Sequence, residues 1–481
     1  MRDYVKLFIN GAPHQISGAD SLLPLSSYLR YQKSLTGTKV VCEEGDCGAC
    51  TVLLGRLNGD NKLSYEIIDS CIHFMFQLDG CHIISVEGLS PQGKLHQVQE
   101  AMIKYFGSQC GFCTPGFIVA IADLVEKEDF IDQKKIKDKL TGNLCRCTGY
   151  EPIVKACLAL NDEKSQKITD EYNNKAIVET VKPLQQETVV LKIDDHGAER
   201  TVYIPKDVES ALKYKAKDPD VKLVAGATDV GVQVNKEVIA PASFMPLGHL
   251  SELSYVNIDS GRVQIGALTS WSKVRDELVE ALPQFTRIID IFASEQIKNV
   301  GTIGGNIANA SPIADSLPFL HIIDAELSLR SEDGERNVNI NDFYIGYKKL
   351  DLKPNELITS ISFNLPNGDM NLYKVSKRKD LDISTFTAAI MIESKFNKVT
   401  SARIAYGGVG PVILRLPKTE AFLVDRPLNE ETFKAAGKIA KTEITPISDV
   451  RASKDFRFML AENILLKFYF ETIAGHEPIA I

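Results

Sequence analysis

The chain has 481 residues, of which 44% are hydrophobic and 25% charged, a composition typical of a globular protein with about three or four domains. Its formal net charge of −8 gives no electrostatic footprint for nucleic acid or for an anionic membrane surface. No stretch approaches the roughly 18 apolar residues of a spanning helix, and the first residues, MRDYVKLFING, lack the apolar core of a signal peptide. We therefore expect a cytoplasmic protein with neither a nucleic-acid nor a membrane partner.

The first predicted elements are two short antiparallel strands. VKLFING alternates apolar and polar side chains and then places Asn10 and Gly11 where a two-residue hairpin turn would lie. Two such strands would open a small ferredoxin-like sheet.

Three cysteines, Cys42, Cys47 and Cys50, follow on one loop, CEEGDCGAC. Their C-x4-C-x2-C spacing is that of a plant-type 2Fe-2S cluster, whereas zinc sites normally use two C-x2-C pairs or a pair with histidines. Disulfides are disfavoured in a chain without an export signal. Gly45 and Gly48 add no Cβ and tolerate positive φ, so the loop can wrap closely around sulfur atoms.

The fourth ligand of such a cluster must come from farther along the chain. Cys71 and Cys81 are both available, and spacing alone does not decide between them.

A second set of cysteines forms two pairs, Cys110 and Cys113 in QCGFCTPG and Cys145 and Cys147 in NLCRCTGY. Each pair precedes a segment with a helical apolar period, so each is expected at a helix N-terminus, where the dipole favours thiolates. Four thiolates on two facing helices suit a second 2Fe-2S cluster, and zinc is the alternative that spacing leaves open. Cys157 is left over.

The motifs GDCGAC, QCGFCTPG and TGNLCRCTGY, in this order, resemble the iron–sulfur region of the molybdenum hydroxylases, the family of xanthine dehydrogenase and aldehyde oxidase. The resemblance implies an α+β multidomain protein that begins with a ferredoxin-like β-grasp domain over residues 1–90 and a four-helix 2Fe-2S domain over residues 91–161. It implies Cys71, and not Cys81, as the fourth ligand of the first cluster. The implied ligands are Cys42, Cys47, Cys50 and Cys71 for the first cluster and Cys110, Cys113, Cys145 and Cys147 for the second.

Residues 162–190 are polar and charged without a sustained apolar period, and we expect a linker there. Beyond residue 201, TVYIPKDVESALKYKAKDP predicts a strand and a short helix, and KLVAGATDVGVQV predicts a strand that runs into a glycine turn.

Two glycine-rich loops are candidates for binding phosphate. LVAGATDVG (223–231) follows a hydrophobic strand, so consecutive backbone N–H groups and the Thr228 hydroxyl could bind an anion; GTIGGNIANASPIAD (301–315) is a second such loop. Neither matches G-x-G-x-x-G or contains a P-loop lysine, which argues against a Rossmann site or an ATPase. Two loops about 80 residues apart are better explained by one ligand with two phosphates than by two ordinary turns.

The same family resemblance extends over this region and implies that both loops bind FAD. It implies an α+β FAD-binding domain of the vanillyl-alcohol-oxidase (PCMH) type over residues 191–369, then an α/β flavoprotein subdomain over 370–481, in which we expect strands to alternate with helices. Phe292 and Leu357 are also candidates for ordinary core residues, and Arg415 and Lys418 are expected on a solvated face. The FAD-binding residues implied are Leu223, Val224, Ala225, Gly226, Ala227, Thr228, Asp229, Phe292, Thr302, Gly305, Asn306, Asp315, Leu357 and Lys374.

The function that the resemblance implies is electron transfer. Full-length family members continue into a molybdopterin domain, whereas this sequence stops at Ile481, so we expect a separate large subunit that binds the molybdenum cofactor, in a heterodimer or heterotetramer. This chain would be the small subunit of a bacterial-type, NAD-dependent xanthine dehydrogenase, passing electrons from molybdopterin through two 2Fe-2S clusters to FAD and on to NAD⁺. Such steps need no acid–base pair, so we nominate no catalytic residue. The loop around Gly45 and Asp46 is expected to lie toward the flavin.

Two alternatives remain open at this point. One is a relative that oxidises aldehydes or purines with oxygen or another acceptor, and the other is a non-catalytic iron–sulfur module for sensing or binding. The organic substrate is expected to be determined by the molybdopterin subunit, so this sequence does not specify it.

Overall fold

The computed structural model describes residues 1–91, 93–162, 167–168, 172 and 174–475. The chain divides into two compact units: unit 1 consists of Met1–Glu252 with Ser294–Thr302, and unit 2 of Leu253–Ala293 with Ile303–Ile481. The short segment 294–302 therefore belongs to unit 1, although the residues on both sides of it belong to unit 2. Over the described ranges, no helix has the length and apolar character needed to cross a membrane.

The first sheet of unit 1 grows from the predicted hairpin. Strands β1 and β2 pair antiparallel, and Asn10 and Gly11 between them have φ of 49° and 81°, the left-handed conformation that a type I′ turn requires. The hairpin is therefore confirmed. The strand order is β2-β1-β5-β3-β4, with β1 and β5 parallel. The elements are β1 (Val5–Ile9), β2 (Ala12–Ile16), α1 (Leu25–Ser27), β3 (Thr51–Leu57), β4 (Leu63–Asp69) and β5 (His82–Ile84).

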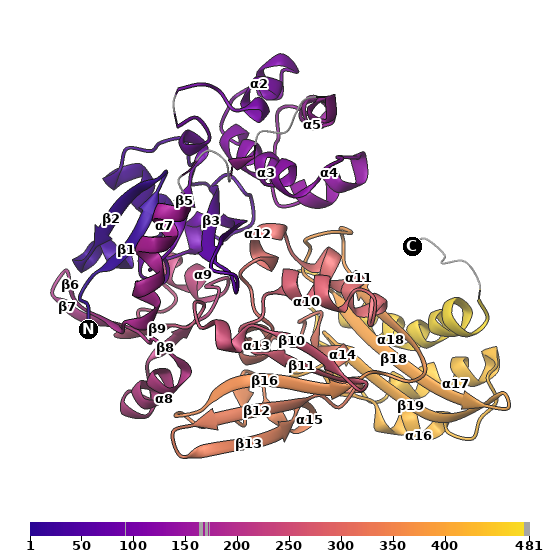
Figure 1. Ribbon diagram of the computed structural model, residues 1–481. Coiled ribbons are helices and arrows are strands. Elements are labelled where there is room, and N and C mark those ends of the chain that lie inside the picture. The colour runs from indigo at the N-terminus through magenta and orange to yellow at the C-terminus, as the bar shows by residue number, and fades with distance from the viewer. Residues whose placement is uncertain (92, 163–166, 169–171, 173, 476–481) are drawn as a thin grey trace. The chain divides into compact units, whose positions relative to one another are not determined.

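Four helices follow this sheet and lie together in Figure 1, as the four-helix expectation requires. Helix α3 begins with Pro115 in its first turn and is buried on all sides from Gly116 to Val125, because α2, α4 and strand β3 pack around it. It is the central element of this part of unit 1. The helices are α2 (Gln97–Lys104), α3 (Thr114–Lys127), α4 (Gln133–Leu140) and α5 (Glu151–Ala159).

The predicted linker, residues 162–190, contains a helix. Within the described part of this range, α7 spans Asn174–Val181 and a 3-10 turn spans Lys182–Gln186. Ile177, Val181 and Leu184 are buried in the same core as the four helices. The expectation of no apolar period is wrong here, because these residues follow one another at intervals of four and three positions and so lie on one side of a helix. The polar residues between them mask this period in the sequence.

A second sheet of unit 1 contains the first of the two glycine-rich loops. Its order is β6-β7-β9-β8, and its apolar face shares one core with the first sheet, in which Leu54 and Ile83 join Val202 and Phe244. The predicted strand and helix after residue 201, and the strand before the glycine turn, are confirmed. The elements are β6 (Val189–Asp195), β7 (Ala198–Ile204), α8 (Val208–Lys217), β8 (Lys222–Val224), α9 (Val230–Asn235) and β9 (Ser243–Pro246), followed in unit 1 by α12 (Glu295–Lys298).

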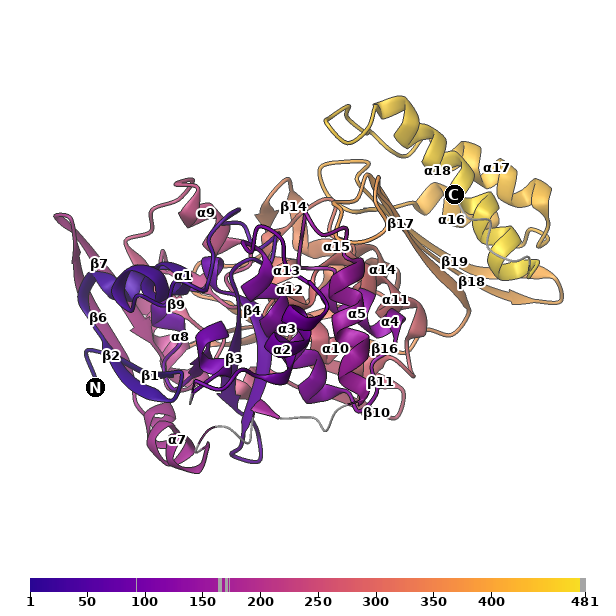
Figure 2. The same ribbon diagram turned by 90° about the horizontal axis from the view of Figure 1, so that it is seen from above.

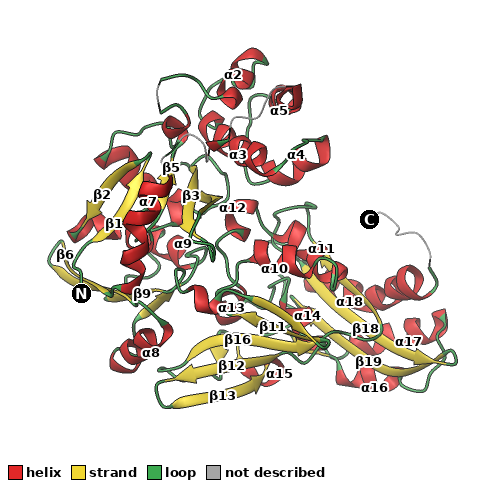
Figure 3. Cartoon of the chain, in the orientation of Figure 1, coloured by secondary structure: helices red, strands yellow, loops and turns green. Residues whose placement is uncertain are grey.

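Unit 2 begins with a five-stranded antiparallel sheet of order β10-β11-β16-β12-β13, whose strands are drawn in yellow in Figure 3. Trp271, the single tryptophan of the sequence, is buried in the core between this sheet and its helices. The range 191–369, expected as one domain, is thus shared between the two units. The elements are β10 (Val256–Asp259), β11 (Arg262–Gly266), α10 (Trp271–Leu278), α11 (Pro283–Phe292), α13 (Ile303–Asn309), α14 (Leu317–Ile322), β12 (Glu326–Ser331), β13 (Gly334–Asn339), α15 (Ile340–Phe343), β14 (Tyr344–Gly346), β15 (Lys349–Leu350) and β16 (Leu357–Asn364).

The last part of unit 2 is an antiparallel sheet of order β17-β18-β19-β20, with α16, α17 and α18 together along one side of it (Figure 2). Alternate residues of β18 enter different cores: Ala388 and Ile390 face these helices, and Ala389 and Met391 face the other core of unit 2. The expected alternation of strands and helices is wrong, because hairpin connections bring all four strands before the three helices. The elements are β17 (Asp369–Val375), β18 (Phe386–Lys395), β19 (Lys398–Gly407), β20 (Leu414–Arg415), α16 (Pro417–Leu423), α17 (Glu430–Ala440) and α18 (Lys454–Phe468).

Arg457 anchors α18 to the rest of unit 2 and is only 2% exposed. Its Nε donates to the Thr385 carbonyl at 3.0 Å, Nη1 to the Ile447 carbonyl at 2.5 Å, and Nη2 to both carboxylate oxygens of Asp449 at 3.0 and 2.9 Å. Burial alone would raise the pKa of Asp449, but the hydrogen bonds from Arg457 and from two backbone N–H groups outweigh it and hold the pKa at about 2. Four hydrogen bonds thus hold the buried guanidinium in place.

We predict that Arg457→Met lowers the free energy of unfolding of unit 2 by about 3 kcal/mol, because the buried Thr385 carbonyl, the Ile447 carbonyl and the Asp449 carboxylate lose a charged donor. Urea unfolding followed by the fluorescence of Trp271 measures this change. Lys454→Met, in the exposed first turn of the same helix, is the control and should change the value by less than about 0.5 kcal/mol. Equal effects of the two substitutions would contradict the role given to Arg457.

Candidate functional site

The structure brings four of the sequence-predicted thiols together in unit 1, and we call Cys42, Cys47, Cys50 and Cys71 the first thiol group. The first three lie on the loop before β3, and Cys71 lies in the short turn after β4. The Cys42 thiol contacts those of Cys47 and Cys71, and the Cys71 thiol also contacts that of Cys50. All four are free of disulfides.

The loop of the first thiol group directs backbone N–H groups at sulfur. The N–H groups of Glu44 and Asp46 each donate to Cys42 Sγ at 3.5 Å, and Gly45 and Gly48 have φ of 72° and 67°. Hydrogen bonds from the Cys47 and Cys71 thiols, with these N–H groups, hold the pKa of Cys42 far below that of a free thiol. The loop therefore stabilises anionic sulfur, as a metal-ligating loop must.

A buried carboxyl group, Asp69, lies against the first thiol group and was not singled out from the sequence. It is 1% exposed, the Cys50 thiol donates to its Oδ1 at 3.5 Å, and its Oδ2 has no hydrogen-bond partner among the described residues. Burial raises the pKa of Asp69 to about 7. Its position at the end of strand β4, in the ordinary stretch IIDSC, offers no motif by which it could have been recognised.

The two remaining cysteines lie elsewhere. Cys81 is buried in the core shared by the two sheets of unit 1, where its thiol donates to the Asp79 carbonyl at 3.7 Å. Cys157 is fully buried on α5 in the helical core, and burial raises the pKa of its thiol to about 12.

The second thiol group consists of Cys110, Cys113, Cys145 and Cys147. Cys113 is the N-cap residue of α3, and Cys145 and Cys147 lie in the loop before α5. Cys110 and Cys147 have their sulfurs 3.6 Å apart, and Cys113 contacts Cys145. The Cys145 sulfur also accepts the N–H of Thr148 at 3.4 Å, while burial and the nearby Cys145 raise the pKa of Cys113 to about 12.

These two groups fit two 2Fe-2S clusters, because each cluster takes four cysteine thiolates. Among the described residues, no set of three or more His, Cys, Asp or Glu side chains is placed to hold a single metal ion. A cluster of two irons does not need such a set, since each iron takes only two protein ligands. The chain thus contains two matched sets of four thiols.

In unit 1, the candidate flavin residues are the run Leu223–Asp229 together with Thr302. At Gly226 a Cβ would lie 1.9 Å from the Val300 carbonyl oxygen, so only glycine fits, and Ala227 next to it has φ of 59°. Gln77 Nε2 supports the loop by donating to the Ala225 carbonyl at 3.2 Å. The result is a tightly held backbone turn, the kind of cradle that phosphate binding requires.

In unit 2, Lys374 and Asp315 form a buried ion pair. Lys374 Nζ donates to Asp315 Oδ2 at 2.7 Å, to the Asp382 carbonyl at 2.7 Å and to Ser384 Oγ at 2.8 Å, so its three N–H groups are all used. Ser384 Oγ donates to the other carboxylate oxygen of Asp315 at 2.5 Å. Burial raises the pKa of Asp315, whereas Lys374 and Ser384 act in the opposite direction.

The other unit 2 candidates differ in exposure. Gly305 is exposed, and Asn306 accepts a hydrogen bond from Ser316 Oγ at 2.7 Å. Phe292 packs edge-on against Trp271 with ring centroids 5.3 Å apart, and Leu357 is buried at the start of β16. Leu357 is therefore a core residue, whereas Phe292 is a partly buried residue packed against the core.

Arg415 is not on a solvated face, which corrects the expectation from the sequence. It bonds to Asp324 Oδ1 at 3.0 Å and to Glu420 Oε1 at 2.8 Å, because β20 places it beside both carboxylates. Lys418, three residues on, is exposed as expected.

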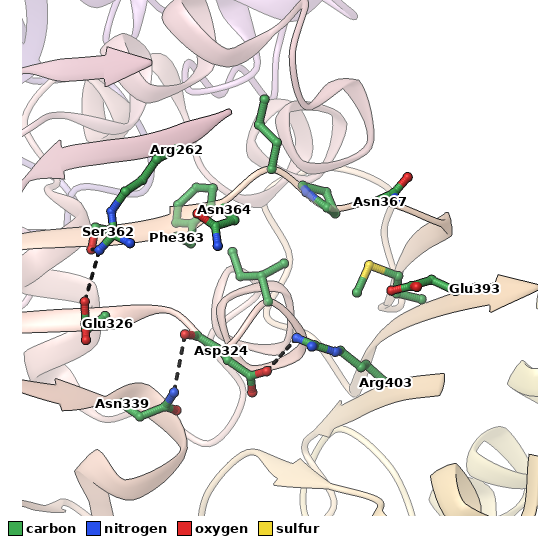
Figure 4. Close-up of a pocket in the computed structure, with 14 residues that line it drawn as sticks. Arg262, Asp324, Glu326, Asn339, Ser362, Phe363, Asn364, Asn367, Glu393 and Arg403 are labelled. Atoms are coloured by element: carbon green, nitrogen blue, oxygen red, sulfur yellow. Dashed lines mark hydrogen bonds and ion pairs between the residues drawn. The ribbon is translucent and has the colours of Figure 1, made fainter. Parts of the chain in front are cut away.

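Unit 2 also has a pocket of about 400 Å³, shown in Figure 4, that contains none of the sequence-predicted residues. Arg262 donates to Glu326 at 3.0 Å, and Arg403 donates to Asp324 at 2.5 Å. We assign no chemistry to this pocket because these charges already neutralise one another. Its lining is Arg262, Ile323, Asp324, Glu326, Asn339, Ser362, Phe363, Asn364, Leu365, Pro366, Asn367, Met391, Glu393 and Arg403.

Three known families match the chain in succession. Residues 85–158 match the family described as "[2Fe-2S] binding domain". Residues 196–366 match the "FAD binding domain in molybdopterin dehydrogenase", and residues 371–472 match the "CO dehydrogenase flavoprotein C-terminal domain". The second thiol group and both glycine-rich loops lie within these matches.

Curated relatives and solved structures agree with these matches. Xanthine dehydrogenase 1 of Arabidopsis thaliana is 30% identical over 96% of this chain, and aldehyde oxidase 1 of Bos taurus is 29% identical over 96%. The chain spans 39% of the length of each. A chain of the carbon monoxide dehydrogenase of Hydrogenophaga pseudoflava has the same fold, with a TM-score of 0.55 and 24% identity over 57% of this chain and 98% of that one. The chain therefore belongs to the molybdenum hydroxylase family and contains the family's 2Fe-2S-binding and FAD-binding domains.

Proposed function

We propose that this chain carries electrons within an oxidoreductase of the xanthine dehydrogenase type, from a molybdopterin component through two 2Fe-2S clusters to FAD and on to NAD⁺. The observation that carries the proposal is the pair of four-thiol groups in a chain that also has an FAD-binding domain. When bound, 2Fe-2S clusters exchange single electrons and flavin exchanges one or two, which suits a relay between a two-electron donor and a two-electron acceptor.

Each part of the chain has a defined task in this proposal. The first thiol group would bind one cluster and the second thiol group the other, with backbone N–H groups stabilising the negative charge on sulfur. The residues Leu223–Asp229 and Thr302 of unit 1 would bind FAD, as would Phe292, Gly305, Asn306, Asp315, Leu357 and Lys374 of unit 2. The domains would span residues 1–90, 91–161, 191–369 and 370–481, joined by the segment 162–190.

The molybdopterin component would belong to a partner subunit, in a heterodimer or heterotetramer located in the cytoplasm. The fold match to a chain of carbon monoxide dehydrogenase, of which 98% is covered, supports an arrangement in which the flavin domains form part of a separate chain. NAD⁺ as the acceptor rests on the similarity to xanthine dehydrogenases. Similarity to aldehyde oxidase is the reason to keep a second candidate, a relative that uses oxygen.

The function is tested on the chain purified anaerobically together with its partner subunit. We expect about four iron atoms and one flavin per chain, and a flavin absorbance that bleaches when NADH is added. The oxygen-dependent relative would be favoured by two results together: NADH does not reduce the flavin, and oxygen reoxidises the flavin after the substrate has reduced it. Iron without any flavin would overturn the electron-transfer proposal and favour a sensory or binding module.

The fourth ligand of the first cluster is tested by replacing, one at a time, the two cysteines between which spacing did not decide. We predict that Cys71→Ser lowers iron from about four to about two atoms per chain and removes one of two paramagnetic cluster signals, because it lies in the first thiol group. Cys81→Ser, the matched control, should leave both signals because that thiol lies in a separate core. Equal loss of iron in the two variants would mean that the fourth ligand is wrongly assigned.

Cys157→Ala provides a second control for the other cluster. It should lose stability by about 1 kcal/mol through a small cavity, yet keep all its iron. Loss of one signal on this substitution would contradict the assignment of the second thiol group.

The flavin site is tested at the buried ion pair. We predict that Lys374→Met lowers bound flavin per chain several-fold with iron unchanged, because the mutation leaves Asp315 buried without a counter-ion, at a cost of about 3 kcal/mol. Lys379→Met, at an exposed position five residues on, is the control and should keep its flavin. Full flavin occupancy in Lys374→Met would remove this lysine from the FAD site.

A further inference from the structure

Within unit 1, a backbone hydrogen bond joins the loops of the two thiol groups. The N–H of Leu144 donates to the carbonyl of Cys47 at 3.0 Å. Cys47 belongs to the first thiol group, and Leu144 immediately precedes Cys145 of the second. The two groups are therefore connected through one peptide hydrogen bond and the covalent chain on each side of it.

Asn143, next to Leu144, makes a second connection between the same loops. Its Nδ2 donates to the Gly48 carbonyl at 3.0 Å and lies 3.3 Å from Thr51 Oγ1, which itself donates to the Gly48 carbonyl at 2.6 Å. The Asn143 side chain is 2% exposed. Because a buried amide is costly unless its hydrogen bonds are made, this orientation of Asn143 is strongly preferred over others.

Gln296 holds Asn143 in that orientation. It is 0% exposed, and its Nε2 donates to Asn143 Oδ1 at 2.9 Å and to Thr51 Oγ1 at 3.1 Å. Its Oε1 lies against the backbone of Gly142, where a Cβ would come within 2.2 Å of it. Gln296 thus contacts the end of the first loop, at Thr51 next to Cys50, and the second loop at Gly142 and Asn143.

The segment that carries Gln296, residues 294–302, also contacts other parts of the candidate electron path. Ile297 packs with Cys50, Cys71 and Ile72 in a small apolar cluster. The Val300 carbonyl lies against Gly226 of the glycine-rich loop, so close that a Cβ at Gly226 would come within 1.9 Å of its oxygen. One segment of nine residues therefore touches both thiol loops and a candidate FAD loop, all inside unit 1.

We propose that Gln296 is a positioning residue that sets the separation and relative orientation of the two thiol groups, and so of the clusters that they would bind. This inference rests on the proposed function. Gln296 touches no thiol itself and acts through Asn143, Thr51 and Gly142. A residue whose only role were to stabilise the fold could be replaced by an apolar side chain of similar volume without changing that separation.

Low-temperature electron paramagnetic resonance of the fully reduced complex measures the separation directly, because the magnetic coupling of two reduced clusters falls steeply with distance. The variants are Gln296→Leu, which keeps the volume and removes the hydrogen bonds, and Gln296→Asn, which shortens the side chain by one methylene. Gln77→Leu is the control, because it removes the hydrogen bonds of another buried glutamine of unit 1 that bonds to Phe74 and Ala225 and to neither thiol loop.

We expect both Gln296 variants to keep two cluster signals in partly reduced protein and to lose the splitting that coupling adds in the fully reduced protein, whereas Gln77→Leu keeps the splitting. An unchanged splitting in either Gln296 variant that retains both clusters would overturn the proposal, as would an equal loss in Gln77→Leu. Should Gln296→Leu lose iron, Gln296→Asn decides the question. Native protein without two cluster signals would instead overturn the proposed function, which separates the two failures.

Discussion

The close approach of three backbone segments at glycines is the constraint on which unit 1 depends. A Cβ at Gly48 would lie 2.3 Å from the Gly142 carbonyl oxygen, and one at Gly116 would lie 2.1 Å from the Gly48 carbonyl oxygen. These glycines belong to the first thiol loop, the start of α3 and the loop before Cys145. Only backbones without side chains can pack this closely, so the hydrogen bond from Leu144 to Cys47 can form. The two thiol groups are adjacent because of this contact.

Two buried carboxyl groups show how the candidate centres differ electrostatically. Asp315 in unit 2 has a lysine and a hydroxyl as partners, so its charge is compensated where it is buried. Asp69 beside the first thiol group has one sulfur contact and a second oxygen without a partner among the described residues. Burial raises the pKa of both carboxyl groups, but only Asp315 has a neighbouring cation, Lys374, that opposes this increase. Because Asp69 lies beside the first thiol group, the electrostatic environments of the two thiol groups differ.

The family matches and the local geometry indicate the same iron–sulfur and flavin regions of the chain. The matched families indicate the cofactor classes, and the structure offers candidate residues for them: two sets of four thiols, one glycine cradle at Gly226 and one buried pair at Lys374. The segment 294–302 lies in sequence within the FAD-binding match and in space with the iron–sulfur part of unit 1. The flavin and iron–sulfur regions are therefore interleaved along the chain and are not simply consecutive.

Several features were readable from the sequence because short spacings encode them. The Asn10–Gly11 turn, the C-x4-C-x2-C loop and the Pro-started helix α3 are local patterns, and each forms where it was predicted. The helix inside the expected linker was missed because its apolar residues lie on one side among polar neighbours. The order of strands and helices after residue 370 was missed because hairpin pairing depends on partners and not on local period.

The remaining features depended on residues far apart in the chain. Which of Cys71 and Cys81 lies beside the first thiol loop is decided by the turn after β4, because spacing to Cys50 allows either. Gln296 meets Asn143 from 153 residues away and Thr51 from 245. No motif marks such a residue, since its role comes from burial and from hydrogen bonds that exist only once three segments have packed. The sequence alone determined the chemistry of the candidate ligands, because short spacings along the chain encode it. The tertiary structure decided which residues lie beside them, because packing joins segments that are far apart in the chain.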